Sequence, residues 1–288
     1  MSKEERIRKI IEYHGREAEG EYCREVGDDL VYDEITWKNI EPFLPERGWI
    51  LDAGGGAGVW SIRMAERSKC IVVLLDVTRD LLKTAKRKTK NKIVNERVEA
   101  LDADIRCIPH QDASFDLVLC EADPLCICGD PERAASELSR VLKPNRYLVA
   151  GVDSTLYRVF RALSQGESLD NVLDFLDEGM SPAEDEAPFE SKSFTPSELI
   201  ELLRKNGLET VRIVGKPIGF GPHVLDVFVA ALPAERRQEI FENTAEKKKF
   251  AEMLLRIYDE PYVSGMGSHL HVVAAKKQES TRLQQADC

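Results

Sequence analysis

Apolar residues occur along this chain in two patterns, short continuous runs and longer amphipathic segments. Two of the runs, Trp49 to Leu51 and Cys70 to Leu75, are each followed by an aspartate. Continuous rather than alternating apolarity is typical of a strand that is buried on both faces of a parallel sheet. Between Leu81 and Lys90 the apolar residues are instead spaced among basic ones, which predicts an amphipathic helix.

Predicted strands and helices alternate from residue 49 to residue 152. Strands are expected at Trp49–Asp52, Cys70–Asp76, Arg97–Leu101, Phe115–Cys120, Tyr147–Val152, Glu209–Val214 and His269–Ala275. This alternation predicts an α/β fold with a doubly wound, seven-stranded, mostly parallel, Rossmann-like sheet. The last strand alternates apolar and polar positions enough to be antiparallel.

We expect a single domain in which helices cover this sheet. Its parts are an N-terminal helical cover (1–47), a cofactor-binding core (48–152), an insert (153–192), the C-terminal part of the sheet with further helical cover (193–278) and a tail (279–288). In the C-terminal part, Thr195 is a good N-cap and Glu198 lies three residues beyond it, so a helix should begin at Pro196. The insert interrupts the alternation, and its acidic, proline-containing stretch at 181–190 is expected to be an exposed loop.

Four glycines follow the first predicted strand, at Gly54, Gly55, Gly56 and Gly58. Glycine accepts a positive φ and has no Cβ, so a ligand can lie against bare backbone. An ordinary strand-to-helix turn needs one or two glycines rather than four. The dinucleotide fingerprint would place its last glycine at Val59, and no Walker lysine is present. The turn therefore suits a nucleoside-like ligand without requiring a pyrophosphate.

Carboxylates stand at the ends of three successive predicted strands, at Asp52, Asp76 and Asp104. In an open α/β sheet, ligands bind at the carboxyl ends of the strands. There, Asp76 could accept hydrogen bonds from ribose hydroxyls and Asp104 from an exocyclic amine. Asp52 could orient the glycine turn or meet a cationic group. Each acid alone is equally well explained as a solvated strand end, but three in succession beside a glycine turn favour a binding site.

Together these segments resemble the class I S-adenosylmethionine-dependent methyltransferases, over about residues 35 to 215. The similar segments are Ile50–Gly58, Val73–Asp76, Asp104–Pro109, Phe115–Val118, Glu137–Pro144 and Phe194–Leu208. The resemblance implies the methyltransferase form of this fold and S-adenosyl-L-methionine as methyl donor, and leaves the acceptor open. After Pro144 the family usually has two glycines, whereas this chain has Asn145 and Arg146. Asparagine tolerates a left-handed backbone, so the turn should survive.

The resemblance also implies roles for the residues of the donor site. The glycine turn would face the methionine portion and the ribose, and Asp76 would hold the ribose hydroxyls. Val77 would lie against the adenine, while Asp104 and Ile105 would contact its edge and face. Cys120 would offer its backbone carbonyl to the methionine amino group. The expected donor-site residues are Asp52, Gly54, Gly55, Gly56, Gly58, Asp76, Val77, Asp104, Ile105 and Cys120.

Methyl transfer needs an aligned nucleophile and, for some acceptors, a base that removes a proton. Candidates for this base, each weak, are Tyr13, His14, Glu121, Asp123 and His223. Each is more simply explained as a packing or surface residue. Alignment alone can suffice for this chemistry, so the catalytic residues stay unassigned at this point.

Cys120, Cys126 and Cys128 lie close together in the sequence. The simplest interpretation is that these cysteines are small, buried hydrophobic side chains. A zinc site would need a second pair of cysteines with suitable spacing, which is absent, so no metal site is expected. Three thiols could instead bind a soft metalloid, which makes an arsenite methyltransferase an alternative function. Another alternative is a non-catalytic protein that binds S-adenosylmethionine.

The net charge of the chain disfavours some classes of binding partner. The 288 residues include 51 acidic and 40 basic ones, a formal net charge of -11, which disfavours nucleic acid as a partner. The sequence has no apolar run of membrane-spanning length and no signal-peptide pattern, and its seven cysteines fit a reduced, cytoplasmic protein. The favoured function is methyl transfer to a small-molecule acceptor, by a monomer or homodimer with no nucleic-acid or membrane partner.

Overall fold

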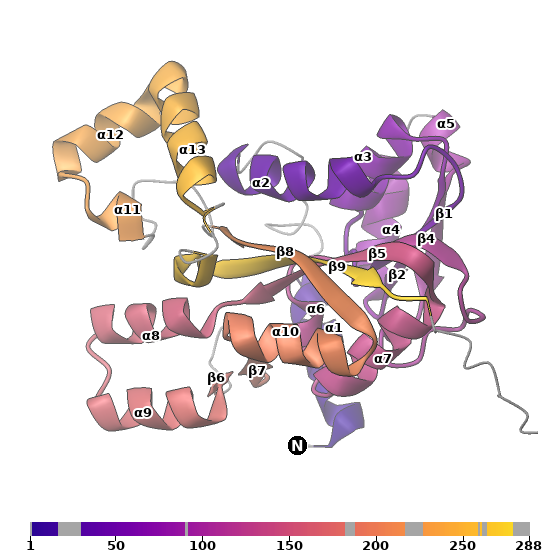
Figure 1. Ribbon diagram of the computed structural model, residues 1–288, viewed down its shortest axis with the longest axis horizontal. Helices are drawn as coiled ribbons and strands as arrows, with labels where there is room; N and C mark the ends of the chain where they lie inside the picture. Colours follow the sequence, from indigo (N-terminus) through magenta and orange to yellow (C-terminus); the bar gives the residue numbers. More distant parts are fainter. Residues whose placement is uncertain are drawn as a thin grey trace, which may run out of the picture.

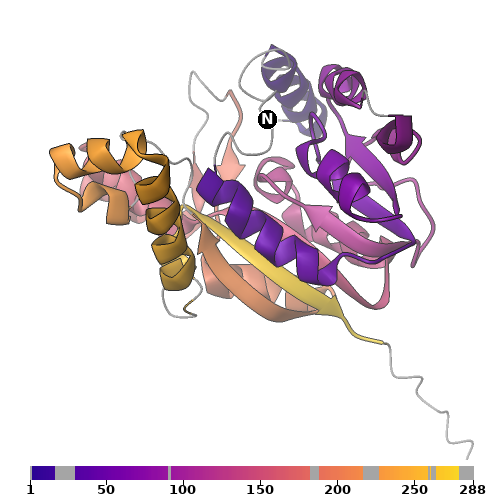
Figure 2. The ribbon, with the colours of Figure 1, turned by 90° about the horizontal axis from the view of Figure 1, so that it is seen from above.

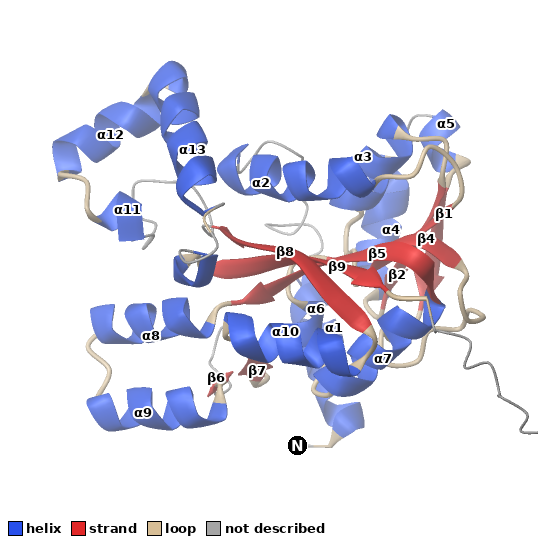
Figure 3. Ribbon diagram, viewed as in Figure 1, coloured by secondary structure: helices blue, strands red, loops and turns tan. Residues whose placement is uncertain are grey.

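A seven-stranded sheet runs through the computed structural model, with helices on both of its faces (Figure 1 and Figure 3). The structure describes residues 2–16, 30–89, 92–181, 188–216, 227–258, 260 and 264–278. The strands of the sheet are β1 (Trp49–Ala53), β2 (Ile71–Asp76), β3 (Val98–Asp102), β4 (Phe115–Cys120), β5 (Leu142–Asp153), β8 (Leu208–Lys216) and β9 (His269–Lys276). Their order is β3-β2-β1-β4-β5-β9-β8, which confirms the predicted fold class.

The helices follow the predicted alternation through the first half of the chain. They are α1 (Lys3–Arg16), α2 (Leu30–Ile40), the 3-10 turn η3 (Glu41–Phe43), α3 (Val59–Arg67), α4 (Arg79–Lys88), α5 (Lys92–Asn95), α6 (Pro124–Ile127), α7 (Pro131–Val141), α8 (Thr155–Ser164), α9 (Leu169–Glu178), α10 (Pro196–Lys205), α11 (Val227–Ala230), α12 (Ala234–Glu242), α13 (Thr244–Tyr258) and the 3-10 turn η4 (Ser264–Met266). Within the described residues, none of these helices combines the length and apolarity needed to cross a bilayer.

The last strand is antiparallel, as its sequence pattern predicts. β9 pairs antiparallel with β5 on one side and with β8 on the other, and the remaining pairs of the large sheet are parallel. β5 begins at Leu142, earlier than expected, because the turn at Asn145 stays within the strand. Asn145 has a left-handed φ of 60°, so the residue that replaces the family's glycine does accept the backbone conformation that the turn needs.

Alternate residues of the central strands face two different apolar layers. On β1, Ile50 packs with the tryptophans Trp37 of α2 and Trp60 of α3 on one face of the sheet. Its neighbour Leu51 belongs to the apolar cluster on the other face, which also contains Leu138 of α7 and Leu199 of α10. Both layers are fully buried in this region, which explains the continuous apolar runs of the sequence.

The insert after β5 contains more regular structure than expected. Ser154 and Ser168 each accept a hydrogen bond at the N-terminus of a helix, which starts α8 and α9, and Gly179 ends α9 with a left-handed φ of 61°. A short hairpin follows, built from β6 (Met180–Ser181) and β7 (Ser191–Lys192). At Thr195 the predicted capping box is present and begins α10.

Two helical groups therefore extend from the carboxyl edge of the sheet. α8 and α9 follow the end of β5, and α11 to α13 come after the end of β8 (Figure 1 and Figure 2). The second group is anchored by an apolar cluster in which Val229, Ile240 and Leu254 pack with Ile35 of α2 and Val214 of β8. The further helical cover expected in the C-terminal part of the chain includes α12 and α13.

Candidate active site

The glycine turn joins β1 to α3 at the carboxyl edge of the sheet. Gly54, Gly56 and Gly58 have left-handed φ values of 77°, 53° and 79°. The backbone N–H groups of Gly54 and Gly55 donate to the carbonyl oxygen of Leu75, at 2.7 and 3.2 Å. The turn is thus fixed to the end of β2, next to the aspartate that the sequence places there.

Most of these glycines are required by the packing of the protein itself. A Cβ at Gly54 would lie 2.4 Å from Cγ of Pro124, and one at Gly55 would lie 2.5 Å from Cγ of Asp52. At Gly58 the nearest atom, in Ala85, would be 3.0 Å away. Only Gly56 meets an ordinary contact, 3.6 Å from Leu81. Among the four, Gly56 is therefore the one at which the protein itself leaves room for an added Cβ.

Asp76 connects the glycine turn to the turn that follows β2. Its Oδ2 accepts from the N–H of Gly56 at 3.0 Å, and its Oδ1 accepts from the N–H of Thr78 at 2.7 Å. Burial raises the pKa of this carboxyl, while the two backbone hydrogen bonds lower it. The side chain is therefore held in one orientation beside the glycine turn.

Asp52 is buried beneath the same turn. Its Oδ2 accepts from the hydroxyl of Ser61 at 2.6 Å, and its Oδ1 has no hydrogen-bond partner within the described part of the chain. Burial raises the pKa of this carboxyl to about 7. A buried carboxylate oxygen without a partner is costly unless a ligand satisfies it, and a cationic group would do so best. Asp52 thus fits a ligand that carries a sulfonium and an amino group.

The remaining donor-site candidates lie along the same edge. Asp104 is held by Arg106, with its Oδ2 2.6 Å from Nη2 of that side chain. Ile105 is buried, Val77 is half-buried next to Asp76, and Cys120 is fully buried at the end of β4. Their contacts with a donor stay predictions.

The candidate bases on α1 pack against the segment that precedes β7. The rings of Tyr13 and His14 lie 5.5 and 6.1 Å from that of Phe189. Burial lowers the pKa of His14 to about 4, so this side chain is neutral at pH 7. α1 is further attached through Arg6, whose Nη2 lies 2.7 Å from Oε2 of Glu190. His223 lies outside the described residues.

Glu121 belongs to a buried cluster of charged and polar side chains. It forms an ion pair with Lys216, and its Oε2 lies 2.9 Å from Nε2 of His271. The adjacent Lys216 holds the pKa of Glu121 well below its usual range. Asn39 reaches Nδ1 of the same His271 at 2.9 Å, and Thr36 is 3.0 Å from Nζ of Lys216. This geometry gives Glu121 a structural role, and its role as a base stays a prediction.

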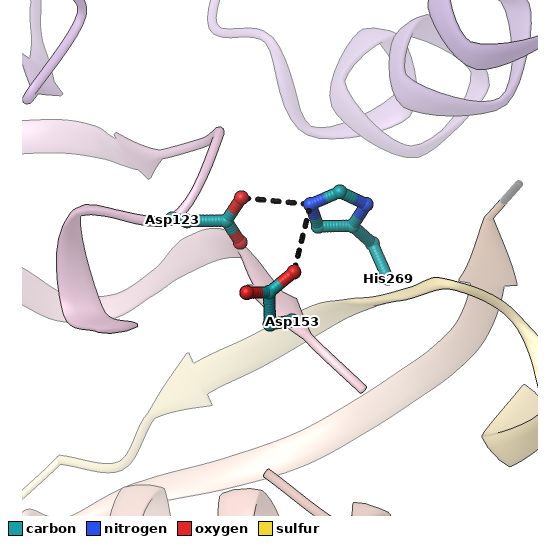
Figure 4. Close-up of side chains that lie close together, drawn as sticks. All are labelled: Asp123, Asp153 and His269. Atoms are coloured by element: carbon teal, nitrogen blue, oxygen red, sulfur yellow. Dashed lines mark hydrogen bonds and ion pairs between the residues drawn. The ribbon is translucent and has the colours of Figure 1, made fainter. Parts of the chain in front are cut away.

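A second polar cluster lies at the ends of β4 and β5 and the start of β9. Nε2 of His269 is 2.7 Å from Oδ2 of Asp123 and 3.5 Å from Oδ1 of Asp153 (Figure 4). Arg158 of α8 approaches the other oxygen of Asp153, at 2.5 Å. Of these residues, the sequence pointed only to Asp123. Asp153 is an acid at a strand end, like the three aspartates singled out above, and that signal could have found it.

The three neighbouring cysteines are interior side chains. Cys120, Cys126 and Cys128 are at most 8% exposed and belong to the larger apolar core. Burial raises the pKa of each thiol, that of Cys128 to about 11. Thiolates are the form that binds soft ions, so this environment does not favour metalloid binding.

Arg158 also lines a cavity between α8 and α9. The cavity has a volume of about 610 Å³, is partly open to solvent, and is also lined by Met180 and Ser181 of β6. Its wall combines arginines with acids and a few apolar groups: Arg158, Arg161, Asn171, Phe175, Met180 and Glu190. The second polar cluster and the cavity are therefore joined through one side chain.

Comparisons with known proteins agree with this arrangement. A family model described as a methyltransferase domain matches residues 50–145. The tRNA 5-carboxymethoxyuridine methyltransferase of Escherichia coli (strain K12) is 25% identical over 255 residues, which are 86% of this chain and 89% of that protein. The demethylmenaquinone methyltransferase of Clavibacter sepedonicus is 33% identical over 124 residues, 43% of this chain and 48% of that protein.

A solved structure extends the agreement to the fold. The structure of an S-adenosylmethionine-dependent methyltransferase from Methanosarcina mazei matches with a TM-score of 0.58 and 21% identity, over 84% of this chain and 98% of that one. The residues matched by the family model include the strands that carry the glycine turn and the aspartates. The chain belongs to the class I S-adenosylmethionine-dependent methyltransferases.

Proposed function

We propose that this methyltransferase holds S-adenosylmethionine along the carboxyl edge of β1, β2 and β4. The donor supplies a methyl group on a sulfonium sulfur, which leaves as a neutral thioether. In this proposal the space beside Gly56 receives the ligand, and the carboxylate of Asp76 accepts from its ribose hydroxyls. The unpartnered Oδ1 of Asp52 stabilises the positive charge near the methionine end.

We further propose that the acceptor is a small molecule. The observation that carries this proposal is the cavity of about 610 Å³ beside the carboxyl edge of β5. Cavities of roughly 300 to 1,000 Å³ are the size that buries a drug-sized ligand. The arginines Arg158 and Arg161 and the acid Glu190 supply polar groups that can fix the orientation of an acceptor. Correct alignment is the main requirement of such a transfer, because the sulfonium is already a good leaving group.

A second candidate acceptor is tRNA. It is supported by the Escherichia coli relative that acts on tRNA and covers 86% of this chain. The net charge of -11 speaks against it, because binding to nucleic acid draws most of its free energy from the neutralisation of phosphates by basic side chains. The small-molecule acceptor is therefore the preferred proposal.

The two acceptors are distinguished by measuring S-adenosylhomocysteine release with fractionated cell extract. The full chain is supplied with the methyl donor and, in separate reactions, with a small-metabolite fraction and with purified bulk tRNA. Release that depends on the metabolite fraction supports the proposal. Release that appears with tRNA alone, and that ribonuclease abolishes, would replace it with the second candidate. A Gly56→Val variant serves as the inactive control.

A further inference from the structure

We propose that Asp123, Asp153 and His269 bind one divalent metal ion, of the Mn²⁺ type, at the carboxyl edge of the sheet. The three side chains come from distant parts of the chain, and each contributes one donor atom to a group in which both carboxylates face Nε2 of His269 (Figure 4). Those atoms are Oδ2 of Asp123, Oδ1 of Asp153 and Nε2 of His269. All three lie within 4.8 Å of one another.

The separations match those of neighbouring ligands around an ion. Oxygen or nitrogen ligands about 2.1 Å from an octahedral ion are about 3 Å apart when they occupy adjacent positions. In this site the distances from Nε2 of His269 are 2.7 Å to Asp123 and 3.5 Å to Asp153, on either side of that value. Without the ion, Nε2 of His269 donates a hydrogen bond to Oδ2 of Asp123. Ion binding would release the proton on Nε2 to solvent, and the tautomer with its proton on Nδ1 then presents the Nε2 lone pair to the ion. Small adjustments of the side chains would therefore complete one face of an octahedron.

The other oxygen of each carboxylate is already used. Oδ2 of Asp153 accepts from the guanidinium of Arg158 at 2.5 Å. Oδ1 of Asp123 lies 3.7 Å from Sγ of Cys126, which can donate its thiol proton. Hydrogen bonds of this kind orient the carboxylates that bind metals in proteins. The remaining oxygen of each carboxylate faces Nε2 of His269, and the ion would replace these two contacts. The division of roles between the two oxygens is the same at both aspartates.

Burial and access also suit an ion that exchanges with solvent. The side chains of His269 and Asp153 are 7% and 8% exposed, whereas that of Asp123 is 23% exposed. An ion can thus reach the site from solvent at Asp123, whereas Asp153 and His269 are buried and fixed in place. Three protein ligands leave up to three positions for water or for an oxygen-bearing group of the acceptor. Two carboxylates and one imidazole suit Mn²⁺ better than Mg²⁺, which takes oxygen ligands.

The test uses Mn²⁺ alone and the full chain after treatment with a chelator. Electron paramagnetic resonance measures the free aquated ion, whose six-line signal falls as the ion binds. We expect about one Mn²⁺ bound per chain, and Asp123→Asn and His269→Gln should each weaken binding by at least tenfold. Asp112→Asn removes the same charge from an exposed side chain that pairs with Arg140, so its affinity should stay within twofold of the wild type.

Binding of S-adenosylhomocysteine confirms that each variant is folded, because none of these positions belongs to the proposed donor site. If His269→Gln does not fold, the partly exposed Asp123 decides the question. The proposal is overturned if the wild-type chain binds no Mn²⁺ at a single saturable site. It is equally overturned if Asp123→Asn binds as tightly as Asp112→Asn does.

Discussion

The carboxylate of Glu121 crosses above β5 to reach the ammonium group of Lys216, and the two form an ion pair in the interior of the protein. Their side chains are 1% and 0% exposed. Two strands, β5 and β9, separate β4 from β8 in the sheet. Gly151 of β5 makes the crossing possible, because a Cβ at that position would lie 2.4 Å from Oε2 of Glu121. The pair therefore ties the central strand β4 to the edge strand β8.

Removing one member of this pair should be strongly destabilising. Lys216→Met leaves the carboxylate of Glu121 buried without its cation, and we expect a loss of about 3 to 5 kcal/mol in the free energy of unfolding. The double variant Glu121→Gln, Lys216→Met should lose less than the single one, because no charge is then left unpaired. Urea denaturation followed by circular dichroism measures both.

The control for this experiment is an exposed ion pair. Lys249→Met breaks the contact with Glu246 on α13, where the lysine side chain is 74% exposed, and it should cost less than about 1 kcal/mol. If Lys216→Met proves no more destabilising than Lys249→Met, the interior pair does not stabilise the fold as the structure indicates.

Valine at Gly56 should abolish binding of S-adenosylhomocysteine. Gly56 has a φ of 53°, which a β-branched residue strongly disfavours, and the added methyl groups would point into the proposed ligand space. Isothermal titration calorimetry measures the affinity. Gly166→Val is the matched control, because Gly166 also has a positive φ, 81°, but lies between α8 and α9 with no atom near its Cβ position. Normal binding by the Gly56 variant would remove this turn from the donor site.

The sequence predicted the strands of the sheet, because these depend on local patterns. Continuous apolar runs identified buried strands such as β2, and the acids at their ends indicated the edge at which we propose that the donor binds. The charged clusters could not be found in this way. In the sequence, Lys216 is only a residue that follows a predicted strand, and His269 is only a polar position in another predicted strand. Their partners, Glu121 and Asp123, lie about a hundred residues or more away in the chain, and only the strand order brings them together.

The helices of the insert illustrate a different limit. The serines that cap α8 and α9 were available as local signals, but α8 buries only Thr155 among its residues. Leu163, Leu169 and Leu173 are 48%, 70% and 58% exposed, so the apolar residues of α8 and α9 are not buried in a hydrophobic core. A prediction based on the helical spacing of buried apolar residues therefore missed both α8 and α9. The same reasoning succeeded at α10, where the capping box precedes a face that is buried through Leu199.

Alanine at Asp76 should weaken the binding of S-adenosylhomocysteine by about 1 to 3 kcal/mol. The proposed hydrogen bonds join a charged carboxylate to the ribose hydroxyls, and each bond of this kind contributes on that scale. Asp102→Ala is the control, because Asp102 is the partner of Asp76 in the register between β2 and β3 and its side chain is 39% exposed. Equal affinities of the two variants in calorimetry would place the ribose away from Asp76.

The stability of the ligand-free protein should depend on pH through Asp52. Burial raises the pKa of this carboxyl from 3.8 to about 7. In the unfolded chain the group ionises near pH 4, whereas in the folded protein it keeps its proton until pH approaches 7. Its contribution to the free energy of unfolding is therefore fully present below pH 4 and is lost as pH rises through 7.

Asp52→Asn has no such proton to lose. We thus expect the variant to gain a few kcal/mol relative to the wild type between pH 4 and pH 8, as measured by urea denaturation at a series of pH values. A constant difference across that range would mean that Asp52 is already ionised, and hence already solvated or paired, in the folded protein.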